Sequence, residues 1–108
     1  MKFHSVASAD IQNGKDQEAW ALVIKSAEYA NINNPWGTQT EVLQKVTGRG
    51  NRVIWVAQHD SLSDADEFRV WVQTDEGHQE ILAGSEELID WSTFDREYFR
   101  VRNIQHKD

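Results

Sequence analysis

The chain contains no cysteine and only one proline, Pro35. Without cysteine it has no disulfide, no thiolate nucleophile and no thiolate metal ligand, and this composition is compatible with a reducing compartment. The first residues, Met1 to Ser5, lack the apolar core of a signal peptide, and no uncharged run is long enough to cross a bilayer. We therefore expect a cytoplasmic protein without a membrane partner.

Basic residues are also scarce. The chain has 11 Lys and Arg residues and 18 Asp and Glu residues, which gives a formal net charge of −7. A surface of this sign repels the phosphates of nucleic acids and of anionic lipids. We therefore expect no nucleic-acid partner.

Recognisable cofactor and metal motifs are missing as well. His78 and Glu80 are separated by one residue, so they point apart on a helix, and there is no HExxH sequence. The segment 48–51 has two glycines but neither the lysine nor the following helix of a phosphate loop, so a hairpin turn explains it better. We expect no metal and no cofactor.

The length of 108 residues suits a single domain spanning residues 1–108, with residues 103–108 expected as a frayed tail. The apolar fraction of 39% is low, but five Trp residues supply large contact areas. A domain of this size buries about two thirds of the surface of its unfolded chain. Additional burial between subunits would therefore matter for its stability.

The first half of the chain predicts a strand at 3–9, a helix at 15–31 and two paired strands at 38–47 and 52–59. In the helix, the residues with buried spacing are Trp20, Val23, Ile24 and Ala27. In the second half, Ser63 followed by acidic residues resembles a helix start. Gly77 is expected to break or bend this helix, and a further helical piece with an interruption at Gly84 is expected to run to Ile89.

The segment 94–102 alternates like a strand and completes the order strand, helix, strand, strand, helix, strand. This order predicts an α+β, ferredoxin-like fold, in which an antiparallel four-stranded sheet carries helices on one face. The strand at 52–59 is apolar on both sides, so the helix-free face also needs a cover. The simplest cover is a second copy of the chain, so we expect a homodimer.

Three segments carry a family resemblance: Asp60–Phe68 continuing to Trp71, then Glu76–Leu82, and the closing Tyr98–Val101. Together with the element order, they make the sequence similar to the dimeric α/β-barrel superfamily, which includes antibiotic-biosynthesis-type monooxygenases and NIPSNAP-like, haem-degrading and stress-responsive proteins. The resemblance implies a cleft between sheet and helices for a small, often aromatic molecule. Some members oxygenate their substrate without metal or flavin, whereas others have no established catalysis. The first strand lacks the Asn of the haem-degrading branch.

Two histidines are candidate catalytic bases, because a neutral imidazole could take a proton from an acidic phenol or enol. They are His4 and His59, on strands that the fold makes neighbours. Arg100 and Tyr98, which share a strand face with Arg96, could hold the resulting anion. The alternatives are partly solvated histidines and arginines that pair with acids of the chain or of a partner.

Trp55 and Trp71 could form aromatic walls of the cleft, and His78 could contact the ligand. Tryptophans at these apolar positions also serve as ordinary core. Two functions remain open. The first is a homodimer that binds a small apolar or aromatic molecule and acts as a cofactor-independent monooxygenase. The second is a non-catalytic binding or interaction protein of the same architecture.

Overall fold

The computed structural model describes residues 2–48 and 51–105. The elements follow in the order β1 (Phe3–Ile11), α1 (Asp16–Asn33), β2 (Thr40–Gln44), β3 (Arg52–His59), α2 (Leu62–Thr74), α3 (Glu76–Leu82), the short 3₁₀ helix η1 (Ser85–Glu87) and β4 (Ile89–Arg100). Half of the expected turn at 48–51 and half of the expected tail at 103–108 lie outside the described residues. Residues 101–105 carry no regular structure and are exposed.

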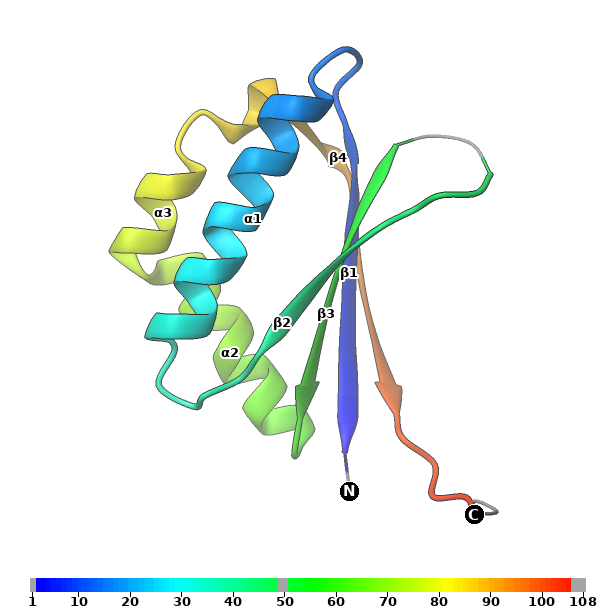
Figure 1. Cartoon of the computed structure of the whole chain (residues 1–108). Helices are drawn as coiled ribbons and strands as arrows, with labels where there is room; N and C mark the ends of the chain where they lie inside the picture. The colour runs from blue at the N-terminus through cyan, green and yellow to red at the C-terminus, as the bar shows by residue number, and fades with distance from the viewer. Residues whose placement is uncertain (1, 49–50, 106–108) are drawn as a thin grey trace.

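The four strands form one antiparallel sheet in the order β2-β3-β1-β4. Figure 1 shows α1, α2 and α3 together on one side of this sheet, while no helix of the described residues lies on its other side. The predicted α+β, ferredoxin-like architecture is therefore confirmed, with the second helical region divided into α2 and α3.

Strand alternation decides which side chains meet the helices. In β1, Ala7, Ala9 and Ile11 are buried against the helices, whereas the residues between them are only partly buried. Their partners in β3 are on the same face, because directly opposed residues of an antiparallel pair share a face. Ala9 thus pairs with Val53.

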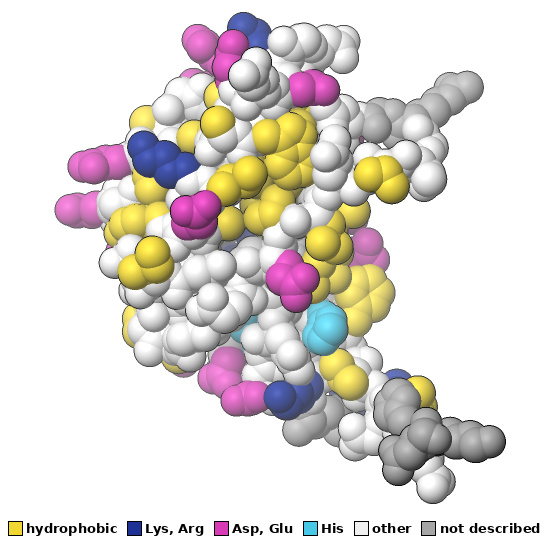
Figure 2. All heavy atoms as spheres, viewed as in Figure 1, with side chains coloured by type: hydrophobic (Ala, Val, Ile, Leu, Met, Phe, Trp, Pro, Cys, Tyr) yellow, Lys and Arg dark blue, Asp and Glu magenta, His cyan; other side chains and the backbone are white. Residues whose placement is uncertain are grey.

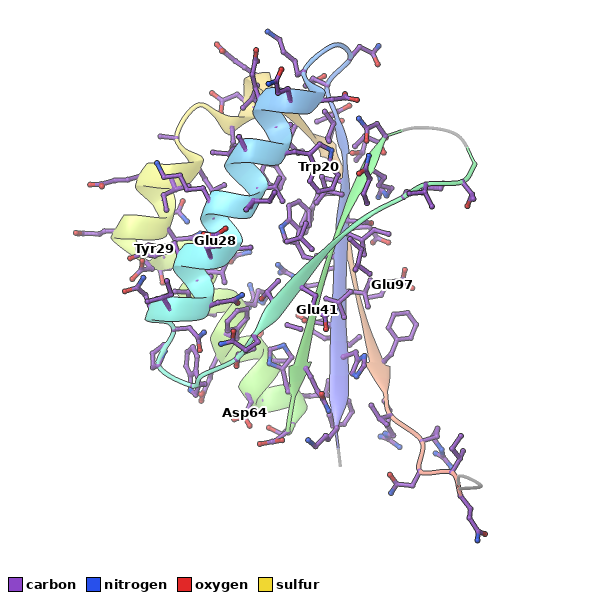
Figure 3. The ribbon with its side chains drawn as sticks, viewed as in Figure 1. Trp20, Glu28, Tyr29, Glu41, Asp64 and Glu97 are labelled. Atoms are coloured by element: carbon purple, nitrogen blue, oxygen red, sulfur yellow. The ribbon has the colours of Figure 1, made fainter. Side chains whose placement is uncertain are left out.

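The bulky core lies at one end of the interface between sheet and helices. It comprises Ala9, Ile11, Ala19, Val23, Val53 and Ile89, with Trp20 packed against it. Figure 3 shows Trp20 between α1 and the sheet. The larger side chains of this set, Val23, Val53 and Ile89, keep the two layers apart at this end.

The predicted buried stripe of α1 is correct at Val23 and Ala27 but wrong at Ile24, whose side chain is 49% exposed. The buried residues of α1 are instead Ala19, Val23, Ser26, Ala27 and Ala30. Small side chains at these positions let the helix lie close to the sheet. The prediction that Ile24 is buried relied on its hydrophobicity. In the fold, its position on α1 directs the side chain to solvent.

Two helix boundaries also differ from the prediction. The cap of α2 is Ser61, whose Oγ accepts a hydrogen bond from the Asp64 backbone N–H at 3.0 Å, and Ser63 lies inside the helix. The break after α2 falls at Asp75, which caps α3, whereas Gly77 lies within α3. A Cβ at Gly77 would collide with the Tyr29 hydroxyl, so this glycine permits close helix packing.

The closing strand is longer than predicted. It begins at Ile89, which was expected to be helical, and it ends at Arg100 rather than at residue 102. Ile89 is 1% exposed and pairs with Ile11. Its apolar side chain fits a helix or a strand equally well, so pairing with β1 decides its conformation.

The observed cap predicts a difference between two serines. Ser61→Ala should lower the free energy of unfolding by about 1 kcal/mol, because the backbone N–H of Asp64 loses its acceptor. Ser63→Ala is the matched control and should be neutral or slightly stabilising, because alanine is the better helix former. Urea unfolding followed by circular dichroism measures both. A larger loss in the Ser63 variant would contradict the assigned cap.

Candidate functional site

A cavity of about 420 Å³ lies between the sheet and the helices. This volume is within the range of small-molecule sites, about 300–1,000 Å³. In the view of Figure 2, hydrophobic side chains gather between the helical layer and the sheet. The cavity is therefore the main candidate site within the described residues.

Small side chains create this space. The sheet contributes Ala7 and Ala57 to the lining, and the helices contribute Ala27, Ala30 and Ala65. All five are buried. Side chains this short leave the two layers apart where larger residues would meet, as they do in the core at the other end.

One wall of the cavity is aromatic. Trp55 of β3 and Trp91 of β4 stack with ring centroids 6.1 Å apart and planes 13° apart. Phe94 lies against both rings, at 6.5 and 5.9 Å. Trp55, a candidate wall residue in the sequence, is thus part of the lining.

Trp91 was not expected as a wall residue, and a bulge in β4 explains why. The pairing of β1 with β4 shifts register between Ser8 and Asp10. At this point Thr93 Oγ1 accepts a hydrogen bond from the Asp10 backbone N–H at 2.8 Å. A bulge breaks strict alternation, so both Trp91 and Phe94 reach the cavity, and a period of two cannot predict this.

Arg96 and Tyr98 of β4 also line the cavity. The guanidinium carbon of Arg96 lies 5.2 Å from the centre of the Phe94 ring. Burial lowers the pKa of Arg96, while a hydrogen bond with Tyr98 opposes this shift. Within the described part of the chain, Arg96 forms no ion pair with a carboxylate.

His59 is not among the lining residues of the cavity, but it contacts one of them. Its side chain is only 4% exposed, and its ring is 5.4 Å from that of Phe68. Its Nε2 is 3.1 Å from the Oγ of Ser5, and Ser5 itself lines the cavity. Burial lowers the pKa of His59, which favours the neutral imidazole at neutral pH. Ser5 therefore connects His59 to the cavity. The sequence did not suggest this role for Ser5.

His4 is on the other face of the sheet. It pairs with Gln58 and Phe99, and it is adjacent in sequence to Ser5, so alternation directs the two side chains apart. His4 and His59 do border a second hollow of about 520 Å³. The strands are neighbours as expected, but His4 is not part of the lining of the main cavity.

His78 of α3 lines the cavity, and its side chain is 5% exposed. Burial lowers its pKa, and its Nδ1 has no hydrogen-bond partner among the described residues. Asp75 holds the start of α3, because its carboxylate accepts hydrogen bonds from the His78 backbone N–H and from the Tyr29 hydroxyl. The bond from Tyr29 is the main cause of the lowered pKa of Asp75.

Two other candidates lie outside the lining. Trp71 packs behind it, stacked on Tyr29 at 6.5 Å and on Phe68 at 6.2 Å. Arg100 lies near the end of β4, 5.7 Å from the centre of the Phe3 ring. The fold thus brings Trp55, Arg96, Tyr98 and His78 to one cavity and leaves Trp71 and Arg100 outside it.

The described residues contain no group of three or more His, Cys, Asp or Glu side chains arranged to hold a metal ion. They also contain no helix with the length and apolarity needed to span a bilayer.

No family model matches the sequence, and no curated protein is significantly similar to it. Solved structures do match the fold. A NIPSNAP family protein from Agrobacterium tumefaciens has a TM-score of 0.79 and 18% identity over 95% of each chain. An uncharacterised NIPSNAP domain protein from Burkholderia xenovorans has a TM-score of 0.78 and 11% identity, over 97% of this chain and 99% of that one.

An antibiotic biosynthesis monooxygenase-like protein from Chloroflexus aurantiacus has a TM-score of 0.65 and 13% identity, over 97% of this chain and 98% of that one. At these identities the likeness concerns the fold. The chain therefore has the ferredoxin-like fold that NIPSNAP and antibiotic-biosynthesis-monooxygenase-like proteins share, as the resemblance in its sequence predicted.

Proposed function

We propose that the protein binds a small apolar or aromatic molecule in the cavity between sheet and helices. The observation that carries this proposal is the combination of small side chains that keep the space open with an aromatic wall, Trp55, Trp91 and Phe94, on one side of it. A cavity that is mainly apolar and contains a few polar groups is typical of ligand sites.

Filling the cavity tests this proposal. Ala27→Leu places a larger side chain in the lining, whereas Ala21→Leu adds the same atoms on the exposed side of α1. Naphthol should quench the tryptophan fluorescence of the unaltered protein and of the Ala21 variant. Its affinity for the Ala27 variant should fall about tenfold or more, because part of the ring loses its buried contacts. Equal binding by both variants would contradict the proposed site.

The uncovered face of the sheet supports a homodimer. Alternation puts Val6, Ile54 and Val56 on this face, together with Leu43 and Phe99, which are 44% and 50% exposed. Figure 3 shows Glu97 on the same side, directed away from the helices. Apolar side chains in one patch rimmed by charged residues are typical of an interface between proteins. A second copy, packing sheet against sheet, is the partner that we propose.

A charge in this face should prevent the assembly. Ile54→Glu puts a carboxylate in the centre of the proposed interface, where burial without a partner is unfavourable. Size-exclusion chromatography with light scattering at micromolar concentration should give a dimer for the unaltered protein and a monomer for this variant. Ile24→Glu, on the exposed side of α1, is the control and should remain dimeric. A monomeric unaltered protein would contradict the proposal.

A second candidate function is cofactor-independent monooxygenation, and the contact between Ser5 and His59 favours it. A neutral, buried imidazole is a competent base, and Ser5 offers a hydroxyl through which a proton could pass from the cavity to His59. Tyr98 is directly opposite Ser5 in the sheet. Tyr98 and Arg96 would stabilise the anion that remains on the substrate.

The reaction needs only the substrate and dioxygen. An aromatic ketone that enolises loses a proton to the Ser5–His59 pair, and its enolate gives electrons to O₂. A new C–O bond then forms at the deprotonated carbon, and cleavage of the O–O bond converts this CH₂ group to a carbonyl. The second oxygen atom leaves as water, with the two hydrogens that the carbon has lost.

Anthrone is a suitable probe, since this reaction converts it to anthraquinone with uptake of one O₂. His59→Gln and Ser5→Ala should each reduce the rate of oxygen uptake by about a hundredfold, which is typical of the loss of a general base. His4→Gln is the matched control and should keep the rate. Unchanged uptake in the His59 variant would leave ligand binding without catalysis, which is the alternative function.

A further inference from the structure

Among the described residues, no acidic side chain lines the cavity. Of its 20 lining residues none is Asp or Glu, although the chain as a whole has 18 such residues. The charged groups in the lining are two arginines, Arg69 and Arg96. The interior of this acidic protein therefore has the opposite electrostatic character to its surface, and low-dielectric walls strengthen that local potential.

Two other arginines of the chain form ion pairs with carboxylates of the described residues, whereas Arg96 does not. Arg52 pairs with Asp10 and Arg69 with Asp66, in both cases at 2.8 Å. In the described residues Arg96 has only Tyr98 and the Phe94 ring as partners, and burial is the main cause of its lowered pKa. A half-buried guanidinium without a counter-ion is costly, so an anion that entered the cavity would offset this cost.

The second arginine reinforces this preference. Arg69 lines the same cavity, and its charge lowers the pKa of Arg96 further. Asp66 holds Arg69 through two hydrogen bonds, at 3.1 and 2.8 Å, and Gln73 holds it through a third, at 3.1 Å. These contacts fix its position and give Arg69 a carboxylate partner, which leaves Arg96 as the lining arginine without one in the described part of the chain.

The wall beside Arg96 favours a flat ligand. The nearly parallel Trp55 and Trp91 rings stack on one another, and Phe94 lies between this pair and the guanidinium group. A ligand that stacks on the tryptophans therefore has its edge close to Arg96. A planar carboxylate matches the planar, forked donors of arginine.

We propose that the cavity selects planar aromatic carboxylates over neutral aromatic molecules, and that Arg96 is the residue that binds the carboxylate. This inference rests on the proposed function, since it requires that the cavity binds a ligand. It adds the chemical class of that ligand, which the lining without acids and the unpaired Arg96 indicate.

The test compares naphthoate, an anion at neutral pH, with naphthol, which has the same rings and no charge. Titration calorimetry on the unaltered protein should give an affinity about tenfold or more higher for naphthoate, as expected for hydrogen bonds to a charged group. Naphthol binding that equals or exceeds naphthoate binding would overturn the inference and leave the proposed function intact. If neither molecule binds, the proposed function fails with it.

Two variants identify the residue. Arg96→Gln should weaken naphthoate binding about tenfold to a hundredfold and leave naphthol binding within about twofold. Arg100→Gln removes a charge from the same strand outside the lining and should change neither affinity. Arg96→Lys should recover part of the naphthoate affinity, since it keeps the charge but not the fork. Equal losses of both ligands in the Arg96→Gln variant would mean that Arg96 acts through packing, which would overturn the inference.

Discussion

The spacing between the helices and the sheet is the constraint on which the site depends. At one end, Val23, Val53 and Ile89 fill the interface and hold the layers at a fixed distance. Towards the other end, alanines occupy the facing positions, among them Ala27 and Ala57, and they do not fill the same distance. Because folded interiors are otherwise close-packed, this combination produces a cavity rather than closer contact between the layers.

The two faces of the sheet have different roles as a result. The face towards the helices carries Trp55 and Arg96, which give the cavity an aromatic wall and a positive charge. The opposite face carries Ile54 and Val56, which no helix covers (Figure 1). One strand, β3, contributes to both, and this explains why it is apolar on both sides. In the homodimer that we propose, a second sheet covers the apolar positions that face away from the helices.

Most elements follow from local patterns. The limits of β3 were predicted correctly at 52–59, and α1 was predicted to within two residues, because each pattern is long and periodic. The errors occur where the pattern allows two outcomes. Ser61 and Ser63 could both cap a helix, and Ile89 could belong to a helix or a strand. Tertiary contacts decided between them, since Ile89 pairs with Ile11 and only the hydroxyl of Ser61 reaches the free N–H of Asp64.

The sequence by itself determined the order of elements, the ferredoxin-like class and the alternation that puts Arg96 and Tyr98 on one face, because these depend on near neighbours along the chain. Only the tertiary structure decided which candidates share a cavity. It puts His59 but not His4 on the face of the main cavity, places Ser5 between His59 and the cavity, and uses a bulge to bring Trp91 beside Trp55. Such contacts join residues far apart in sequence, and their geometry depends on register and on how the layers pack, which no local pattern encodes.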